Sequence, residues 1–171
     1  MTGAAVVLIG PMGAGKTSVG RRVARTLGLP FADTDKLVVR DHGPIPELFA
    51  RHGEAHFRAL ERAAVAEALS TGGVVALGGG AVLDPATRDA LTRHRVILLT
   101  VDPRIVAGRI GGGGRPLLAD DEDPVARWER IYDERRDVYE STADVTIDTS
   151  TGPLAEVVDR IVAWVRQEDP T

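Results

Sequence analysis

The chain of 171 residues contains no cysteine and no asparagine, and only two of its 21 basic residues are lysines, Lys16 and Lys36. Without cysteine it has neither disulfide bonds nor a thiolate zinc site. Its net charge of −4 and pI near 5.6 exclude the broad basic face that nucleic acids and membrane surfaces require. Positive charge for an anionic ligand therefore has to be local. A lysine that persists in a chain so rich in arginine is expected to have a specific task.

Long apolar runs are also missing. No apolar stretch approaches the roughly 20 residues of a membrane span. Residues 1–10 have no basic region, and their apolar run is too short for a signal peptide. With 43% hydrophobic residues the chain fits one compact domain. We therefore expect a monomeric cytoplasmic protein without a nucleic-acid or membrane partner.

What the sequence does contain is an alternation of strand and helix patterns. Apolar runs predict strands at 4–9, 31–33, 74–77, 95–101 and 145–147. Helical spacing and caps predict helices at 16–27, 45–51, 54–70, 84–93 and 124–139, with others beginning near 102 and 153. This order predicts an α/β fold, a five-stranded parallel sheet with helices on both faces. Ligands are expected beyond the carboxyl ends of its strands.

The first predicted strand runs directly into the glycine-rich motif GPMGAGKT at residues 10–17. Its spacing, G-x-x-x-x-G-K-T between a buried strand and a helix, is that of a phosphate-binding loop (P-loop). Glycines let the backbone wrap a phosphate, so that successive N–H groups and the helix N-terminus face the anion. Lys16 is then a mobile charge for the outer phosphates, and Thr17 offers a hydroxyl to Mg²⁺. The alternative, a glycine-rich turn with a helix cap, is disfavoured by this context.

Two carboxylates, Asp33 and Asp35, follow the short second strand. At positions i and i+2 of a strand end they point the same way, so both are expected to face the phosphate site. One is suited to hold Mg²⁺ through water, and the other to accept a proton from a substrate hydroxyl. The alternative is that aspartate caps the helix that follows. From spacing alone the two interpretations are about equal.

Three consecutive glycines, Gly78, Gly79 and Gly80, end the third strand. They expose backbone N–H groups and remove side chains, so that a ligand can lie against the chain. A tight turn between strand and helix needs only one or two glycines. Three in a row therefore favour a functional interpretation modestly.

Two arginines lie on predicted helices in informative positions. Arg58 has Glu54 at i−4 and Glu61 at i+3, which equally well describes an ordinary surface ion-pair set. Arg135 falls within the apolar stripe of its helix, whereas Arg136 lies off that stripe. An arginine on an inward face either extends its head to water or meets an anion. The anion is favoured, because a buried unpaired charge is costly.

A run of four glycines at 111–114 precedes Arg115. Such a loop can close, exclude water and bring its arginine to the charge that develops on a transferring phosphoryl group. The alternative is a solvated linker with an incidental arginine. Arg109, at the end of the preceding helix, is a second candidate for contact with phosphate or adenine.

Together these motifs resemble the shikimate kinase family over nearly the whole chain. The resemblance is carried by GPMGAGKT (10–17), DTD (33–35), FR (57–58), LGGGAV (77–82), RPLL (115–118) and R-x-x-x-Y (135–139). GKT is common to many P-loop proteins, whereas DTD, GGG and RPLL in this order are much more specific. The resemblance implies the nucleoside-monophosphate-kinase fold with strand order 2-3-1-4-5. It also implies an Mg²⁺-dependent enzyme that transfers the γ-phosphoryl group of ATP to the 3-hydroxyl of shikimate, in aromatic amino-acid biosynthesis.

The resemblance further implies a role for each matching residue. ATP would lie on Gly13, Ala14, Gly15, Lys16, Thr17 and Ser18, with Arg109 and Pro153 beside adenine and Arg115 on the lid. Thr17 and Asp33 would hold Mg²⁺. Shikimate would lie on Asp35, Arg58, Gly79, Gly80 and Arg135, with the arginines around its carboxylate. Lys16, Asp35 and Arg115 would be the catalytic residues. Residues 34–72 would form the substrate-binding segment and about 110–123 the lid, around a core of 1–33, 73–109 and 124–171.

Several other functions compete with this one. Another small-metabolite kinase, such as gluconate kinase, shares the P-loop but is not expected to keep DTD, Arg58 and Arg135 together. A nucleoside-monophosphate kinase would show a base-reading pattern in residues 33–73, where none is recognised. A GTPase needs an Asn-Lys-x-Asp motif, and the chain has no asparagine. A non-catalytic ATP-binding module would be expected to lose the lid arginine or the carboxylates.

Overall fold

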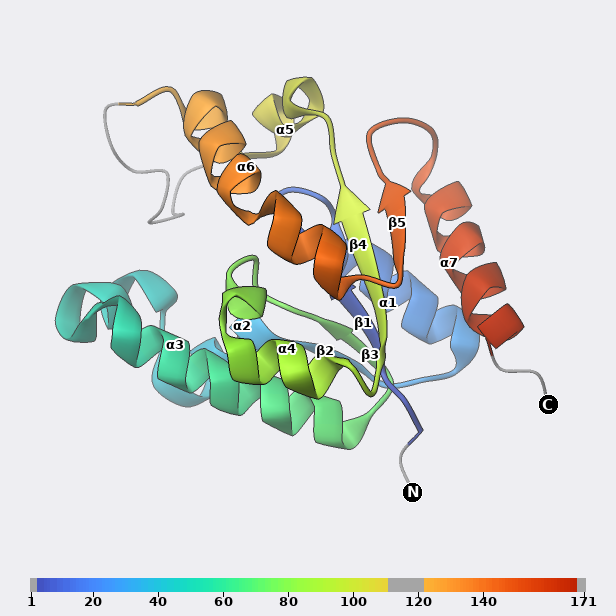
Figure 1. Ribbon diagram of the computed structural model, residues 1–171, viewed down its shortest axis with the longest axis horizontal. Coiled ribbons are helices and arrows are strands. Elements are labelled where there is room, and N and C mark those ends of the chain that lie inside the picture. The colour runs from blue at the N-terminus through green and yellow to red at the C-terminus, as the bar shows by residue number, and fades with distance from the viewer. Residues whose placement is uncertain (1–2, 111–121, 169–171) are drawn as a thin grey trace.

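The structure is a computed structural model that describes residues 3–110 and 122–168. Strands and helices alternate along the chain, as the sequence predicts (Figure 1). The strands are β1 (Val6–Ile9), β2 (Phe31–Asp33), β3 (Val74–Ala76), β4 (Arg95–Thr100) and β5 (Val145–Asp148). The helices are α1 (Lys16–Leu27), α2 (Thr34–His42), α3 (Ile45–Thr71), the short 3-10 helix η1 (Ala81–Leu83), α4 (Pro85–Leu91), α5 (Pro103–Ile110), α6 (Pro124–Thr142) and α7 (Leu154–Glu168).

The five strands form one parallel sheet in the order β2-β3-β1-β4-β5, which confirms the predicted topology. β1 is central, pairing with β3 on one side and β4 on the other. Because all strands run the same way, their carboxyl ends meet at one edge of the sheet. The loops after β1, β2 and β3 carry the predicted site motifs, so the topology brings these motifs together.

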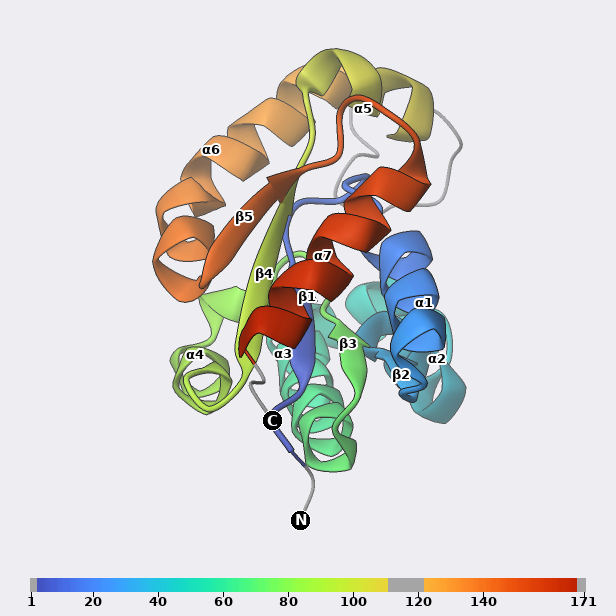
Figure 2. The same cartoon turned by 90° about the vertical axis from the view of Figure 1, so that its right-hand side faces the viewer.

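Alternate residues of the central strands fill two hydrophobic cores, one on each face of the sheet. Val6 and Leu8 of β1 pack in the core that also contains residues of α1, α5 and α7. Val7 and Ile9 point to the opposite face, where the core includes residues of α3, α4 and α6. Figure 2 looks onto the face that α1 and α7 cover. Burial on both faces explains why β1 reads as a continuous apolar run.

A third, smaller core joins α2 to α3 and supports the predicted substrate-binding segment. It consists of Val38, Leu48, Phe57 and Ala64, packed against partly buried neighbours. α3 is interrupted at Gly53, whose φ of 82° and ψ of 174° are not helical. The two helices predicted over 45–51 and 54–70 are therefore the two arms of one kinked helix. Glycine permits this backbone conformation without steric strain.

The helix boundaries depart from the predicted ones by a few residues. Asp84, Asp102 and Asp123 each accept a hydrogen bond from a backbone N–H group of the turn that follows, so the aspartate–proline pairs begin helices as predicted. α6 ends at Thr142, three residues beyond the predicted end at Tyr139. Within the described part of the chain, no helix is both long and apolar enough to cross a membrane.

Candidate active site

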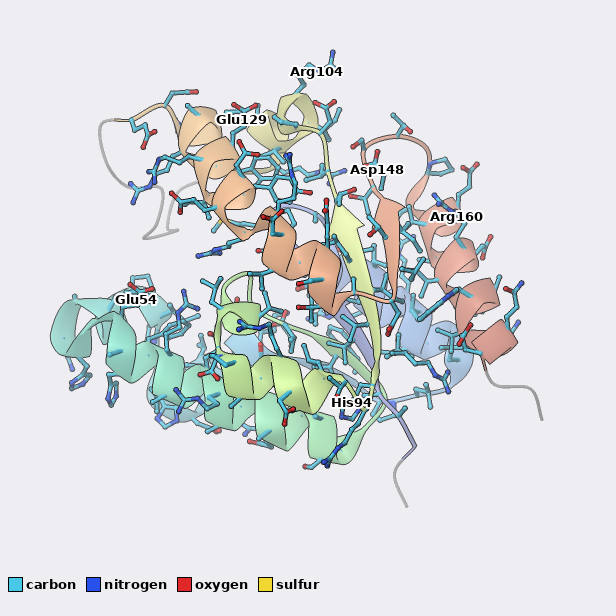
Figure 3. The ribbon with its side chains drawn as sticks, viewed as in Figure 1. Glu54, His94, Arg104, Glu129, Asp148 and Arg160 are labelled. Atoms are coloured by element: carbon cyan, nitrogen blue, oxygen red, sulfur yellow. The ribbon has the colours of Figure 1, made fainter. Side chains whose placement is uncertain are left out.

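A cavity of about 660 Å³ opens at the carboxyl edge of the sheet. The P-loop, α2, the first half of α3, the loop after β3 and the inner face of α6 line it. In Figure 3, Glu54 marks α3 and Glu129 marks α6, the two helices on either side. His94, which precedes β4, lies at the opposite end of the sheet (Figure 3). A ligand in this cavity touches segments from four regions of the sequence.

Most of the residues predicted from the sequence meet in this one cavity. Ala14 is fully buried and Pro153 is exposed, and neither lines the cavity. Arg115 and the predicted lid between 111 and 121 lie outside the described residues. The predicted residues that do line it are Gly13, Gly15, Lys16, Thr17, Ser18, Asp33, Asp35, Arg58, Gly79, Gly80, Arg109 and Arg135.

The P-loop has the conformation that a phosphate site requires. Gly13 and Gly15 have φ values of 82° and 91°, which residues other than glycine rarely adopt. Gly15 is the N-cap of α1, so the positive end of the helix dipole faces the loop. Lys16 Nζ donates to the carbonyls of Gly10 at 2.7 Å and Pro11 at 2.9 Å. The lysine thus lies over the loop, at the cavity.

Asp33 makes both contacts that the sequence interpretation left as alternatives, one with the phosphate site and one with the helix that follows. Its Oδ2 accepts a hydrogen bond from Thr17 Oγ1 at 2.6 Å, which joins the carboxylate to the P-loop. Its Oδ1 accepts from the Lys36 N–H group at 3.2 Å, which caps α2. The strand ends at Asp33, however, and Asp35 lies in the first turn of α2. The strand alternation used to orient both carboxylates was therefore wrong, although both line the cavity.

The oxygen atoms of Thr17 and Asp33 fit a magnesium ion. Mg²⁺ prefers oxygen ligands and is usually bound through one or two protein groups, with water and substrate phosphates completing its shell. Among the described residues no three His, Asp or Glu side chains cluster as a self-sufficient metal site. A hydroxyl and a carboxylate beside a phosphate loop supply the partial ligand set that Mg²⁺ with a nucleotide requires.

The three glycines after β3 make room for charged side chains. A methyl group added at Gly78 would lie 2.6 Å from Asp35 Oδ1, and one at Gly80 would lie 2.5 Å from both terminal nitrogens of Arg58. At Gly79 it would lie 3.6 Å from an Arg135 nitrogen. None of the three has a positive φ. Close approach, rather than an unusual turn, explains why three glycines stand here.

Arg58 pairs with both glutamates noted in the sequence, but one of them is buried. Arg58 Nη1 lies 2.8 Å from Glu61 Oε1, and Nη2 lies 3.5 Å from Glu54 Oε1. The Glu61 side chain is only 4% exposed. Burial raises the pKa of Glu61, and Asp35 adds to this, while Arg58 and Arg135 oppose it. Glu61 is thus a site residue that the sequence interpretation left on the surface.

Arg135 lies on the inward face of α6 as predicted, and Arg136 is exposed. No carboxylate of a described residue lies within ion-pair distance of Arg135, which leaves its charge directed to the cavity. Tyr139, one turn further, is 1% exposed and donates from its hydroxyl to Gly79 O at 2.6 Å. Burial raises the pKa of Tyr139, so its hydroxyl stays protonated and able to donate.

An apolar wall, which the sequence interpretation did not identify, completes the cavity on the side of α2 and α3. Its residues are Val39, Pro44, Ile45, Pro46, Phe49 and Phe57. Phe49 and Phe57 are in contact, with ring centroids 4.8 Å apart and ring planes inclined by 36°. The apolar spacing of these helices was visible in the sequence. What the sequence lacks is a mark that separates residues facing a ligand from residues facing a core.

On the other side, Arg109 connects the P-loop to the loop that follows β5. Its Nη1 donates to Gly13 O at 2.8 Å and its Nη2 to Thr149 O at 3.2 Å. Arg109 therefore lies at the predicted nucleotide site. Residues 148–153, predicted to flank adenine, contribute none of the described residues that line the cavity.

Comparisons with known proteins agree with this geometry. A family model described as shikimate kinase matches residues 12–166. The shikimate kinase of Salinispora arenicola is 50% identical over 146 residues, 84% of this chain and 86% of its own, and that of Thermobifida fusca is 46% identical over 91% of both chains. A solved shikimate kinase from Acinetobacter baumannii, in complex with shikimate, superposes with a TM-score of 0.92 at 32% identity, over 99% of this chain and 97% of that one. A gluconokinase from Sinorhizobium meliloti has a TM-score of 0.61 at 22% identity, over 96% and 92%, and shares the fold alone.

The raised pKa of Glu61 leads to a prediction about stability. The folded protein binds a proton on Glu61 more readily than the unfolded chain, so the ionised carboxyl lowers the free energy of unfolding at pH 7.5. That loss is recovered as the pH falls through the raised pKa. Glu61→Gln is therefore expected to be at least as stable as the native protein at pH 7.5, with an advantage that shrinks toward pH 4.5.

Thermal unfolding at several pH values measures this difference. Glu67→Gln is the matched control, because Glu67 lies on the same helix with a side chain that is 51% exposed. Glu67→Gln is expected to change the midpoint temperature of unfolding little at any pH. A Glu61→Gln protein that is less stable by more than about 1 kcal/mol at pH 7.5 would show that the bond to Arg58 outweighs the cost of burial.

Proposed function

The chain belongs to the shikimate kinase family, and we propose that it transfers the γ-phosphoryl group of ATP to the 3-hydroxyl of shikimate. The observation that carries this proposal is the composition of the cavity at the carboxyl edge of the sheet. A P-loop and the paired Thr17 and Asp33 lie in it together with Asp35 and two arginines, Arg58 and Arg135. A phosphate donor and a carboxylate-bearing polyol acceptor are the pair of ligands that suits these groups.

The acceptor end of the cavity combines charge with a flat backbone surface. Shikimate has one carboxylate and three ring hydroxyls. Arg58 and Arg135 would bind the carboxylate, since guanidinium groups match its geometry. Gly79 and Gly80 let the ring lie against the main chain, and the apolar wall of Phe49 and Phe57 covers its carbon face. The two arginines supply local positive charge in a protein whose net charge is −4.

In the transfer, the bond between the γ-phosphorus and the β,γ-bridging oxygen breaks as a bond forms from the 3-hydroxyl oxygen to the same phosphorus. The hydroxyl proton passes to Asp35, and the products are ADP and shikimate 3-phosphate. Lys16 and the P-loop amides hold the phosphates and stabilise negative charge on the oxygens of the moving group. Because the transition state of phosphoryl transfer is loose, holding the hydroxyl in line is as important as removing its proton.

Thr17 and Asp33 would hold Mg²⁺, with Asp33 acting through a water molecule. The ion neutralises phosphate charge when it is bound with ATP. Thr17 Oγ1 donates to Asp33 Oδ2, so both oxygens lie beside the P-loop. The donor chemistry and the position of both groups support this assignment.

The remaining assignments complete the proposal. Arg109 and Pro153 would flank adenine, and Arg115 would act on the transferring group from a lid that spans about 110–123. Residues 34–72 would be the acceptor-binding segment, since α2, both arms of α3 and the turn between the two helices carry the apolar wall. We place the enzyme in the cytoplasm as a monomer, in aromatic amino-acid biosynthesis.

A panel of acceptors tests the proposed reaction directly. A coupled assay of ADP release with Mg-ATP is run with shikimate, quinate, gluconate, AMP and water alone. Saturable turnover is expected with shikimate and little with the others. Turnover with gluconate instead would support kinase activity but contradict shikimate as the acceptor. Binding of ATP without ADP release on any acceptor would indicate a non-catalytic module.

Asp35→Asn tests the proposed base. The amide keeps the size and a hydrogen-bond acceptor but is a far weaker base, so kcat is expected to fall roughly 10²-fold or more while KM for ATP changes little. Asp41→Asn is the matched control, since Asp41 lies on the same helix and is exposed. A kcat within a few-fold of the native value would mean that Asp35 only orients the hydroxyl.

Arg135→Ala and Arg136→Ala form a natural pair for the carboxylate site. Arg135 lines the cavity, and its exposed neighbour pairs with Asp133 at 2.8 Å. Loss of Arg135 is expected to raise KM for shikimate about 30- to 1000-fold, the factor for a charged hydrogen-bonded contact of roughly 2–4 kcal/mol. Loss of Arg136 should leave KM for shikimate nearly unchanged. Equal effects in both variants, or a change in KM for ATP alone, would contradict the assignment.

A further inference from the structure

Five consecutive carbonyl groups of the P-loop, from Gly10 to Ala14, accept hydrogen bonds from side chains. The first two bind Lys16, which belongs to the loop itself. The next three are held by residues that are remote in the sequence. The donors are Trp128 Nε1 to Met12 O at 2.7 Å, Arg109 Nη1 to Gly13 O at 2.8 Å, and Thr149 Oγ1 to Ala14 O at 2.8 Å.

We propose that Arg109, Trp128 and Thr149 form a carbonyl clamp, a set of positioning residues that holds the P-loop in its phosphate-binding conformation. The three come from α5, from α6 and from the loop after β5, and are 96, 116 and 135 residues away from the carbonyls that they bind. The inference rests on the proposed function in one respect, that the loop binds nucleotide phosphates. It adds a role in which these residues act through the loop, separate from the contact that Arg109 is proposed to make with adenine.

The clamp acts through the geometry of the peptide bond. In a trans peptide the C=O and the following N–H point in opposite directions. Holding the carbonyls of Met12, Gly13 and Ala14 outward therefore turns the N–H groups of residues 13–15 away from the clamping side chains. Gly13 and Gly15 line the cavity, so we infer that their N–H groups are available to a phosphate there, whereas the Ala14 N–H donates to Pro11 O at 3.3 Å.

External restraint is needed because the loop is rich in glycine. Glycine changes conformation more readily than any other residue, so a free loop of this composition samples many orientations of its amides. A loop already held in its binding conformation loses less entropy when the anion arrives. Amides held in this way also stabilise transition-state charge without reorganising.

Thr149 provides the cleanest evidence for a dedicated contact. Its side chain is buried, and its Oγ1 lies 2.8 Å from Ala14 O and 3.0 Å from Thr100 O. The single hydroxyl proton can serve only one of these acceptors. Because the contact to Ala14 O is the shorter one and Thr100 O also has the backbone N–H of Thr149 at 2.8 Å, we assign the hydroxyl proton to Ala14. A valine of the same shape would leave the Ala14 carbonyl without its partner.

Trp128 makes the contact to Met12 from a rigid position. The residue is 3% exposed, and its ring stacks on Tyr132 with centroids 5.4 Å apart. A buried indole N–H needs an acceptor, and here that acceptor is the Met12 carbonyl. Arg109 completes the clamp, and both Arg109 and Trp128 also line the cavity. Loss of either side chain would change direct contact as well as clamping, so Thr149, which does not line the cavity, tests the clamp most directly.

Binding of inorganic tripolyphosphate tests the proposal, because this probe occupies the phosphate site without contacting an adenine site. Calorimetry with Mg²⁺ present measures its affinity and that of ATP for the native protein, Thr149→Val and Trp128→Phe. Each variant is expected to weaken both ligands by a similar factor of roughly ten, the usual effect of leaving one buried acceptor unpaired. Thr149→Ser should restore both affinities, and KM for shikimate should be unchanged in all variants.

Two controls separate clamping from loss of packing. Trp164→Phe removes the other tryptophan, which is partly buried against the core on α7, and Thr87→Val removes another buried threonine hydroxyl, on α4. Both are expected to alter stability without altering tripolyphosphate affinity. If Trp128→Phe fails to fold, Thr149→Val, which conserves shape, still decides the question.

Two results would overturn the clamp. One is affinity for tripolyphosphate within twofold of the native value in both Thr149→Val and Trp128→Phe. The other is weaker binding of ATP alone, which would assign Thr149 to the nucleoside half of the site. Native protein that binds tripolyphosphate but does not phosphorylate shikimate would refute the proposed function, while the clamp would still be judged by its variants.

Discussion

The parallel pairing of β1 with β3 and β4 is the constraint on which the site depends. It places the carboxyl end of the central strand between the ends of its neighbours, so that a phosphate loop, an acidic turn and a glycine run leave the sheet at one edge. Burial on both faces fixes the register of β1, since a slip by one residue would exchange the side chains of its two cores. The positions of the functional loops are thus a consequence of packing.

Within the site, opposite charges lie close together because the backbone gives them room. The glycines after β3 let Asp35, Arg58 and Arg135 approach the main chain, and the hydroxyl of the buried Thr34 accepts the Gly78 N–H at 3.0 Å. Glu61 shares this region at a cost, visible as its raised pKa. The arrangement sacrifices some stability to hold positive groups at the cavity, where we propose that an anionic acceptor binds.

The sequence was sufficient for the five parallel strands, for the P-loop and for the inward face of Arg135, because each depends on periodicity or on a local motif. The order of the strands came from the resemblance to a known family. The sequence was insufficient for Glu61, since the same i, i+3 spacing describes an exposed pair and a buried one. It oriented Asp35 by strand alternation although the predicted strand ends at Asp33, because nothing local showed that α2 begins at Thr34. Contacts such as Trp128 with Met12 join residues 116 positions apart and leave no local pattern.

The residues that make the carbonyl contacts lie far apart in the sequence, and this affects when the site forms during synthesis. A nascent chain emerges from its N-terminus, so the P-loop appears early, while Thr149 follows Ala14 by 135 residues. The same holds for the sheet, in which β1 waits for β3 and β4 before either edge is paired. Contacts of such high sequence separation form late. The nucleotide site is therefore finished only when nearly the whole domain has been made, and ATP meets a completed fold rather than guiding its first steps.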